Sequence, residues 1–519
     1  MLHFAHNIIK FQADKPKVQV NNKFLLKSTQ NLITLFTVSK VIFLMYQRLT
    51  LPSISPRVLL AITQFFADWH GTCLLYSGGN LDSAQTSLLS LFPFETVTVY
   101  GQQLCYRKGN QFQNTSVQNP WEGLQDHFFA SLANDHDAVA FGWFGYGMGA
   151  FTDQDKCLPY RPSSTPDAYW QRSAIVLNVD QKTEEAIVQV DLSAGEEVEK
   201  KAKDWVQRFA TLKGWQDFLN TLSLPLTSYA SSSSSMAFSD CLQRRAIYKK
   251  KVQHAKELIR EGEIYQVNLS QVFEFQSSRH PFSLFRQVSE INPAPFSSYF
   301  RYEETTLVST SPERFLCKKN QMLEARPIKG TMQRGETVEE DQLLQERLLA
   351  SPKERAELLM ITDLMRNDLG KISIAGSVQT LELWRCEAYA NVFHLLSIIR
   401  SIVKPKLTPL EIVRSCFPGG SITGCPKLRA MEVIDDLERR PRGIYTGSIG
   451  YFNGRGDFDL NIAIRTLVVK KDELSLQLGG GIVIDSNPEQ EYQETLFKGA
   501  SLFHILQTKE IIKDVDRHE

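Results

Sequence analysis

Lys329 stands in a short stretch that could hold a reactive amine. The stretch reads EARPIKGTMQRG over residues 324–335, so Lys329 follows a Pro-Ile pair and precedes a Gly-Thr pair. Proline fixes its own φ and removes a backbone donor, whereas glycine allows a turn and the close approach of a ligand. An amine on such a stiff turn is either a surface charge or a positioned nucleophile, and the stretch alone leaves both open.

Two sets of carboxylates could bind a divalent cation. Glu491, Glu494 and Lys498 are spaced i, i+3, i+7 and therefore share one face of a predicted helix. Glu354 and Glu357 share a face of another helix. Carboxylates from two helices could hold one Mg²⁺ and leave positions for water and an anionic substrate. A solvated helix face is the alternative for each glutamate.

Several other residues suggest contacts with an anion. FPGGSITGCPK, residues 417–427, leads into a helix whose free N–H groups and dipole favour a small carboxylate, although an ordinary helix cap is the alternative. The Walker pattern fails there because no Ser or Thr follows the lysine. Arg465 interrupts a buried-looking strand and therefore requires an anion. His394, in NVFHLLS, is either a core histidine or a catalytic one.

The composition excludes some classes of function. Lys plus Arg and Asp plus Glu number 58 each, so the formal net charge is zero, which argues against a bulk nucleic-acid binder. No two of the 8 cysteines form a CxxC pair, so neither a zinc site nor a redox pair is indicated. The most apolar N-terminal run, residues 32–45, has 14 residues including a lysine, which is short for a membrane span. We therefore expect a cytoplasmic protein without a membrane segment.

Four segments divide the chain. Residues 1–45 are predicted to be an N-terminal extension, either disordered or not translated. Residues 46–225 are rich in short strand-like runs such as TVTVYG and SAIVLNV. YASSSSSM marks a flexible serine-rich linker at 226–238. Residues 239–512 alternate strands with helices, and helices are predicted around 248–262, around 351–367, after GGSITGCPK and from Pro488 onward.

The motifs of the C-terminal region occur in a distinctive order. They read GEIYQVNLSQ, SPERF, RPIKGT, KERAELLMITDLMRNDLGK, VFHLLS, FPGGSITGCPKLRAMEVID, RGIYTGSIGY, IAIRT and GGGIVIDSNPEQEYQET. This series, over about residues 240–505, resembles the chorismate-utilising enzymes, which include anthranilate, aminodeoxychorismate, isochorismate and salicylate synthases. The N-terminal region matches more weakly, through LLYSGG and GWFGYGMGAF. The resemblance implies an α+β fold, an α/β sandwich in which two antiparallel β-sheets are flanked by helices.

The resemblance also implies a set of site residues. In the family, Mg²⁺ bridges the substrate carboxylate to glutamates that match Glu357 and Glu494, with Glu491 nearby. His394 matches a histidine beside the departing hydroxyl group. The predicted substrate contacts are Gln266, Gly330, Thr331, Ser421, Tyr445, Arg465, Gly479, Gly480, Gly481 and Lys498.

Lys329 and Gln266 separate the branches of the family. Anthranilate and isochorismate synthases typically read PIAGT, whereas the aminodeoxychorismate branch reads PIKGT, as here, and its lysine is thought to attack the chorismate ring covalently. Glu313 in SPERF is then a proton shuttle. Water-using relatives carry a lysine where Gln266 stands, and glutamine cannot act as a base. The implied reaction is therefore amination of chorismate to 4-amino-4-deoxychorismate for 4-aminobenzoate and folate, with anthranilate formation as the alternative.

The source of ammonia is expected on another chain. No G-x-C-x-G nucleophile motif of a glutaminase occurs in this sequence, so the resemblance implies a separate glutamine amidotransferase subunit as partner. Feedback-inhibited anthranilate synthases read LLES where this chain reads LLYSGG. The sequence therefore leaves open whether the N-terminal region binds tryptophan.

Overall fold

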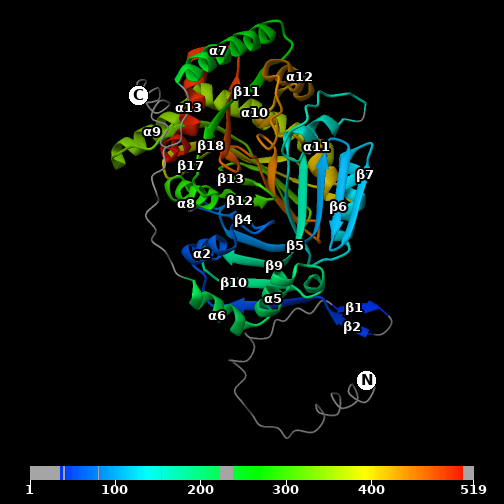
Figure 1. Ribbon diagram of the computed structural model, residues 1–519. Coiled ribbons are helices and arrows are strands. Elements are labelled where there is room, and N and C mark those ends of the chain that lie inside the picture. Colours follow the sequence, from blue (N-terminus) through cyan, green and yellow to red (C-terminus); the bar gives the residue numbers. More distant parts are fainter. Residues whose placement is uncertain (1–34, 39–40, 80, 154, 223–237, 507–519) are drawn as a thin grey trace, which may run out of the picture.

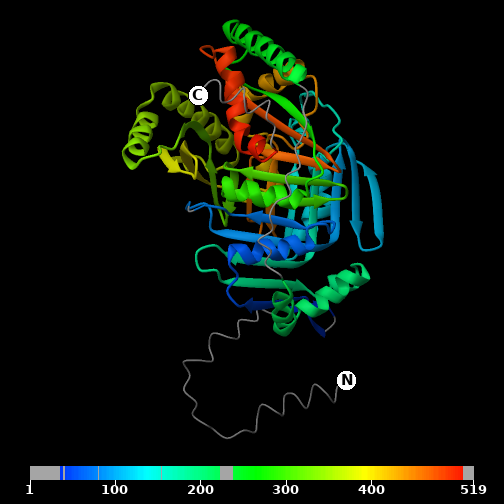
Figure 2. The ribbon, with the colours of Figure 1, turned by 60° about the vertical axis from the view of Figure 1, so that its left-hand side comes forward.

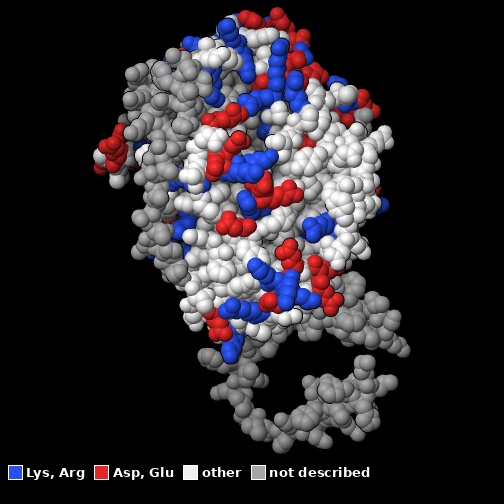
Figure 3. All heavy atoms as spheres, in the orientation of Figure 1, with Lys and Arg blue, Asp and Glu red and all other residues white. Residues whose placement is uncertain are grey.

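The computed structural model describes residues 35–38, 41–79, 81–153, 155–222 and 238–506. The serine-rich stretch and residues 1–34 of the predicted extension lie outside this range. The described part of the extension is a hairpin of β1 (Leu35–Val38) and β2 (Val41–Leu44). Among the described residues, no helix is both long and apolar enough to cross a bilayer. Acidic and basic side chains intermingle on the face shown in Figure 3.

All other strands pair antiparallel in two layers that share two long strands, β5 (Thr86–Tyr100) and β9 (Ala168–Asp180). The register between them breaks from Pro93 to Glu95, and the chain bends there (Figure 1). The N-terminal half of β5 and the C-terminal half of β9 pair in the first layer. The C-terminal half of β5 and the N-terminal half of β9 pair in the second layer. The predicted sandwich of two antiparallel sheets is therefore confirmed, with the two sheets joined through shared strands.

The strands of each layer come from both halves of the sequence. The first layer runs in the order β3 (Tyr46–Leu51), β10 (Ala186–Asp191), β9, β5, β4 (Cys73–Tyr76), β12 (Phe296–Tyr302), β13 (Thr305–Ser311), β22 (Thr466–Lys470), β23 (Glu473–Ile482), β11 (Gln266–Gln276) and β19 (Gly424–Cys425). The second runs β7 (Gln111–Ser116), β6 (Gln103–Lys108), β5, β9, β8 (Val139–Phe144), β20 (Ser448–Asn453), β21 (Phe458–Asn461), β14 (Arg314–Lys319), β15 (Met322–Arg326) and β18 (Val392–Ile402). Strand β16 (Ile328–Gln333) continues β15 along one edge of β18, and β17 (Gln379–Ala388) pairs with the other edge.

Helices lie on the outer faces of the layers (Figures 1 and 2). Their bounds are α2 (Pro56–Phe66), α3 (Pro120–Leu124), α4 (Ala130–Ala133), α5 (Lys200–Phe209), α6 (Leu212–Thr221), α7 (Phe238–Arg260), α8 (Pro281–Ile291), α9 (Val338–Ala350), α10 (Pro352–Ile372), α11 (Pro409–Cys416), α12 (Lys427–Glu438) and α13 (Pro488–Ile505). The described residues also include one π-helical segment, η1 (Gln125–Phe129), and three 3₁₀ helices, η2 (Tyr146–Phe151), η3 (Ala194–Glu196) and η4 (Gly420–Ile422). The four helices predicted from periodicity correspond to α7, α10, α12 and α13.

Capping explains where the two helices of the site begin. Ser351 accepts a hydrogen bond from the N–H of Glu354 at the start of α10, and proline occupies the first helical position. Asn487 accepts from the N–H groups of Glu489 and Gln490 at the start of α13, again before a proline. These caps fix the first turns of both helices, and the carboxylates of the site lie on those turns and the ones that follow.

Buried apolar side chains hold the helices on the layers. Tyr248 of α7 and Phe503 of α13 pack on the first layer, in one cluster with Phe273 of β11. Met365 of α10 belongs to a second cluster that covers the second layer. Between the layers, the rings of Trp143 and Phe300 meet edge to face at 5.1 Å. Because each burial removes large apolar surface from water, the positions of α10 and α13 relative to the strands are strongly fixed.

Candidate active site

A cavity of about 450 Å³ gathers most of the residues singled out in the sequence. It lies between α10, α13, β16, β18 and β23. Its walls include Glu313, Lys329, Gly330, Thr331, Glu357, His394, Ser421, Tyr445, Arg465, Gly479, Gly481, Glu491, Glu494 and Lys498. Gln266 and Gly480 do not line it. Residues from eight separate sequence motifs therefore meet in one place, as a common active site requires.

One end of the cavity carries two lysine–glutamate ion pairs. The Lys329 Nζ lies 2.8 Å from Glu357 Oε2, and the Lys498 Nζ lies 2.7 Å from Glu494 Oε1. Burial alone would lower the pKa of Lys329, but the carboxylates of Glu357 and Glu494 raise it above its usual value. In this state Lys329 is therefore a charged ammonium group held by Glu357. It must leave that ion pair and lose a proton before it can act as a nucleophile.

The two carboxylates of α13 differ in charge state. The Lys498 ammonium group lowers the pKa of Glu494 to about 2, although burial opposes the shift. Burial and the charge of Glu494 raise the pKa of Glu491. Glu491 accepts a hydrogen bond from the Ser486 hydroxyl at 2.6 Å, while its second oxygen is buried and has no hydrogen-bond partner within the part of the chain that the structure describes. A buried carboxylate oxygen of this kind is available to a ligand group or a cation.

The carboxylates that could bind a metal ion do not lie close enough together to do so in this structure. Within the described part of the chain, no three His, Cys, Asp or Glu side chains lie close enough to hold a metal ion together. Lys329 and Lys498 neutralise two of the carboxylates expected to bind Mg²⁺. The donor chemistry nevertheless fits a hard cation, because all the candidate ligands are carboxylate oxygens and one oxygen of Glu491 is unpaired.

His394 faces the cavity from β18. It pairs across the ladder with Thr331 of β16, whose hydroxyl lies 3.0 Å from His394 Nδ1. Nε2 is buried and has no hydrogen-bond partner among the described residues, so it is available to a ligand. Burial and the nearby Arg465 lower the pKa of His394 to about 3. The ring is therefore neutral at physiological pH and can offer a hydrogen bond but not the proton of an imidazolium ion.

Glu313 is the group whose charge changes near neutral pH. It lies on the turn between β13 and β14, is 5% exposed, and accepts a hydrogen bond from the Ser421 hydroxyl at 2.7 Å. Burial raises the pKa of Glu313 to about 7, although Ser421 and the N–H of Ile328 oppose the shift. A carboxyl group with this pKa exchanges protons readily at physiological pH, so Glu313 fits the predicted role of proton shuttle better than His394 does.

Glu313→Gln is expected to stabilise the protein in alkaline solution. The pKa of Glu313 rises from about 4.5 to about 7 on folding, so its favourable contribution is full below pH 4.5 and is lost as pH rises through 7. The neutral amide avoids this loss, so the variant should gain about 2 kcal/mol relative to the parent between pH 5 and pH 8. Urea unfolding at the two pH values measures the change. A stability difference that does not vary with pH would contradict the raised pKa.

Arg465 supplies an unpaired positive charge. It lies between β21 and β22 with a φ of +50°, which breaks the strand and turns the side chain toward the cavity. Burial lowers the pKa of Arg465, while Tyr389 and Glu313 oppose that shift. Its guanidinium group forms no ion pair within the residues that the structure describes. A guanidinium group held without a counter-ion is poised for a carboxylate of the substrate.

The glycines of β23 leave room beside the cavity. A Cβ at Gly481 would lie 2.8 Å from Gln266 Nε2 and 3.1 Å from Lys329 Nζ. A Cβ at Gly480 would lie 3.3 Å from the unpaired Oε2 of Glu491. Gln266 and Gly480 thus stand directly behind the wall rather than on it, although both were predicted to touch the substrate. A side chain at either glycine would fill space next to the reacting groups.

Tyr389 and Asn268 are among the residues at or near the cavity that the sequence did not single out. The ring of Tyr389 meets the His394 ring edge to face at 4.8 Å, and its hydroxyl donates to the carbonyl of Pro312. Asn268 lines the cavity with a buried, unpaired Oδ1. Side chains two positions apart in a strand point to the same face of the sheet. Asn268 follows Gln266 by two positions in β11, so this alternation could have predicted it from the sequence. Tyr389 follows from the β17–β18 hairpin, which was not predicted.

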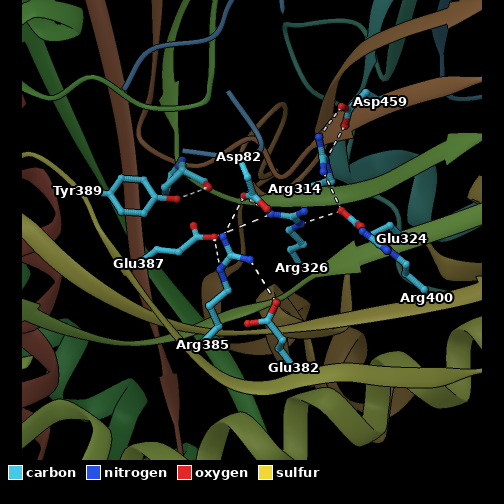
Figure 4. A network of polar contacts seen from close by, with 11 residues as sticks. Asp82, Arg314, Glu324, Arg326, Glu382, Arg385, Glu387, Tyr389, Arg400 and Asp459 are labelled. Carbon is cyan, nitrogen blue, oxygen red and sulfur yellow. Dashed lines mark hydrogen bonds and ion pairs between the residues drawn. The ribbon is translucent and has the colours of Figure 1, made fainter. Parts of the chain in front are cut away.

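A second, larger cavity of about 730 Å³ contains none of the predicted site residues. Its wall includes Asp82, Arg314, Glu324 and Arg326, which form a network of ion pairs (Figure 4). Strands β14 and β15 separate the two cavities, because Glu313 faces the first and the adjacent Arg314 faces the second. The smaller cavity remains the candidate active site, since the reactive groups converge there.

Comparison with known proteins identifies the family. The family described as chorismate binding enzyme matches residues 86–504. The chloroplastic aminodeoxychorismate synthase of Arabidopsis thaliana is 46% identical over 258 residues, which cover 49% of this chain but only 28% of that protein. Aminodeoxychorismate synthase component 1 of Escherichia coli K12 is 35% identical over 420 residues, covering 78% of this chain and 86% of that protein.

A solved structure supports the same assignment. The crystal structure of anthranilate synthase component I from Streptococcus pneumoniae TIGR4 matches with a TM-score of 0.68 and 28% identity, and it covers 82% of this chain and 93% of that chain. The relatives thus include synthases of both aminodeoxychorismate and anthranilate. Fold, cavity and family match agree with the resemblance seen in the sequence motifs. The chain belongs to the family of chorismate binding enzymes.

Proposed function

We propose that this chain is component I of an aminodeoxychorismate synthase, which converts chorismate and ammonia to 4-amino-4-deoxychorismate. The observation that carries the proposal is the amine of Lys329, which lines the same cavity as Glu313, His394 and Arg465. The anthranilate branch of the family has alanine at this position. The aminodeoxychorismate synthases among the relatives support the proposal.

The charges of the cavity suit chorismate, a dicarboxylate. Arg465 would bind one carboxylate, and the open backbone of Gly479 and Gly481 would allow the substrate to lie against β23. Tyr445 closes the same wall, because its hydroxyl lies 2.7 Å from the position of a Cβ on Gly479. The neutral His394 would donate a hydrogen bond from Nε2 to the departing hydroxyl, once Thr331 donates to Nδ1.

The proposed reaction has two displacements. The neutral amine of Lys329 forms a bond to a ring carbon of chorismate, the ring double bonds shift, and the hydroxyl on another ring carbon takes a proton and leaves as water. Ammonia then forms a bond to the carbon that carried the hydroxyl, the double bonds shift back, the bond to Lys329 breaks, and one proton is released. Glu313, whose pKa is about 7, is the group that can give the first proton and accept the second.

Mg²⁺ would be held by Glu357, Glu491 and Glu494 and would neutralise a substrate carboxylate beside them. The unpaired oxygen of Glu491 supports this assignment. Since Lys329 is paired with Glu357 in the present structure, Lys329 would have to leave Glu357 for that carboxylate to hold a cation. Glu357 would then pair with Lys329 in the cation-free state and bind the cation in the cation-bound state.

Lys329→Ala is therefore expected to tighten the binding of a divalent cation in the absence of chorismate. Removing an ammonium group 2.8 Å from Glu357 leaves that carboxylate with only the more distant and exposed Lys353 as an ion-pair partner among the described residues, and affinity for Mn²⁺ should rise about 10-fold. Isothermal titration calorimetry with Mn²⁺ measures the change. Lys353→Ala is the matched control, because Lys353 lies 3.9 Å from Glu357 but is 66% exposed. Equal or weaker binding in Lys329→Ala would show that the lysine and the cation do not compete.

Ammonia would come from a glutamine amidotransferase subunit. The name component 1, borne by the Escherichia coli relative, supports a partner of some kind. We expect ammonium salts to support turnover by the isolated chain, and glutamine to support it only after the partner is added. Anthranilate synthesis is the second candidate, favoured by the match to the Streptococcus structure. It requires no lysine nucleophile.

The proposed lysine route can be tested by trapping. The purified chain is incubated with chorismate and Mg²⁺ in an ammonia-free buffer, and its peptides are mapped by mass spectrometry. The proposal predicts that the peptide with Lys329 gains the mass of chorismate less one water. A modification on Lys498 instead, or no modified peptide in a preparation that turns over when ammonium salt is added, would contradict the route.

A further inference from the structure

Four side chains form a closed ring of alternating charge beside the active site (Figure 4). Arg326 Nη1 lies 2.7 Å from Asp82 Oδ1 and 3.8 Å from Glu387 Oε1. Arg385 lies between the same two acids, at 3.2 Å from Asp82 Oδ1 and 3.0 Å from Glu387 Oε1. Arg326 and Glu387 are 9% and 5% exposed, whereas Asp82 is 43% exposed. Of the two acids in the ring, Asp82 is therefore partly exposed to solvent and Glu387 is buried.

The ring joins the strands on both sides of β18. Arg326 ends β15, three residues before Lys329, and Arg385 and Glu387 belong to β17 on the opposite edge of β18. His394 of β18 lies across from Glu387 on one side and from Thr331 on the other. The ion pairs of Asp82 with both arginines thus connect the strands on the two edges of β18, the strand that carries His394.

The backbone at Lys329 needs such support. The register between β16 and β18 shifts between Ile328 and Thr331, so Lys329 and Gly330 lie in an irregular part of the ladder. Gly330 has a φ of +88°, which adds freedom at the residue after the lysine. Upstream of Lys329, Arg326 is held by Glu324 at 2.7 Å and by Asp82 at 2.7 Å. These contacts hold Arg326 in place, directly before the irregular segment that contains Lys329 and Gly330.

We propose that Asp82 is a positioning residue for Lys329, acting through Arg326 from a loop between β4 and β5 that is remote in sequence. This inference rests on the proposed function, because it assigns the positioned group as the nucleophile. Asp82 touches neither the cavity wall nor the reacting groups. Its loss should let the segment 326–331 shift and should slow the chemical step rather than weaken substrate binding, since misplacement of a reacting group lowers rate steeply.

Asp82→Asn in the full chain tests the proposal, with Glu382→Gln as its matched control. Glu382 pairs with Arg385 at 3.2 Å but does not touch Arg326, and it is 50% exposed. We expect Asp82→Asn to lower kcat for ammonia-dependent turnover about 10-fold, with the KM for chorismate changed by less than about 2-fold. Glu382→Gln should retain the parental kcat. Asp82→Glu, which restores the charge, should recover part of the loss.

A second readout does not depend on turnover. An amine-reactive acylating reagent is applied to the folded proteins, and modification of Lys329 is measured against that of Lys498 in the same cavity. The proposal predicts that this ratio changes at least about 3-fold in Asp82→Asn and stays constant in Glu382→Gln. An unchanged kcat together with an unchanged ratio would overturn the positioning role. A parent without amination activity whose ratio still responds to Asp82→Asn would instead refute the proposed function alone.

Discussion

Lys329→Ala is expected to lower the formation of 4-amino-4-deoxychorismate by about 1,000-fold or more, because removal of a covalent nucleophile eliminates the route rather than weakening one contact. The substitution should not unfold the protein, since Lys329 is paired only at the cavity wall and alanine leaves the glycine after it unchanged. Quantitative product analysis with saturating ammonium salt measures the effect. Any residual product is expected to be anthranilate, because the variant restores the PIAGT sequence of the other branch.

Lys353→Ala separates loss of the nucleophile from loss of charge. Lys353 also carries an ammonium group near Glu357, at 3.9 Å, on the exposed rim of the cavity. Its removal should change turnover by no more than about 3-fold, as for a surface ion pair. Equal losses in the two variants would mean that Lys329 acts through its charge alone. Undiminished amination in Lys329→Ala would contradict the covalent role.

Arg465→Gln is expected to separate substrate binding from stability. The guanidinium group has no ion-pair partner among the described residues and is assigned to a carboxylate of chorismate. Loss of a charge-assisted hydrogen bond costs about 1.5–3 kcal/mol, so the affinity for chorismate should fall about 10- to 100-fold. The unfolding temperature should stay constant or rise, because an uncompensated charge in a partly buried site is removed.

Calorimetric titration with chorismate and thermal unfolding together test this expectation. Arg455→Gln is a suitable control, since Arg455 is 62% exposed and lies away from the cavity. It should change neither quantity. A fall in unfolding temperature of Arg465→Gln would indicate that Arg465 has a structural partner, and unchanged affinity would remove it from the binding site.

The sequence was informative where a motif combines chemistry with a backbone requirement. The glycines of β23 and the turn at Lys329 impose backbone requirements that can be recognised in the sequence alone. Both segments line the cavity. The spacing of Glu491 and Glu494 correctly placed two carboxylates on one helix face. Arg465 was readable as a break in an apolar strand, and the structure shows that the break is a left-handed backbone conformation.

What could not be predicted depends on contacts between remote segments. The ring of Asp82, Arg326, Arg385 and Glu387 joins a loop after β4 to strands more than two hundred residues later, and no local pattern in the sequence encodes such a pairing. The pairing of Lys329 with Glu357 likewise depends on the packing of α10 against β16. The bend shared by β5 and β9 was invisible because each half reads as an ordinary strand.

The most direct test of the proposed function is the identity of the product. The purified chain is incubated with chorismate, Mg²⁺ and an ammonium salt at mildly alkaline pH, where free ammonia is available, and the products are separated and identified by mass. We expect an aminated product that retains the enolpyruvyl side chain and yields 4-aminobenzoate when a lyase is added. Formation of fluorescent anthranilate with release of pyruvate would contradict it and would assign this chain to the other branch of the family.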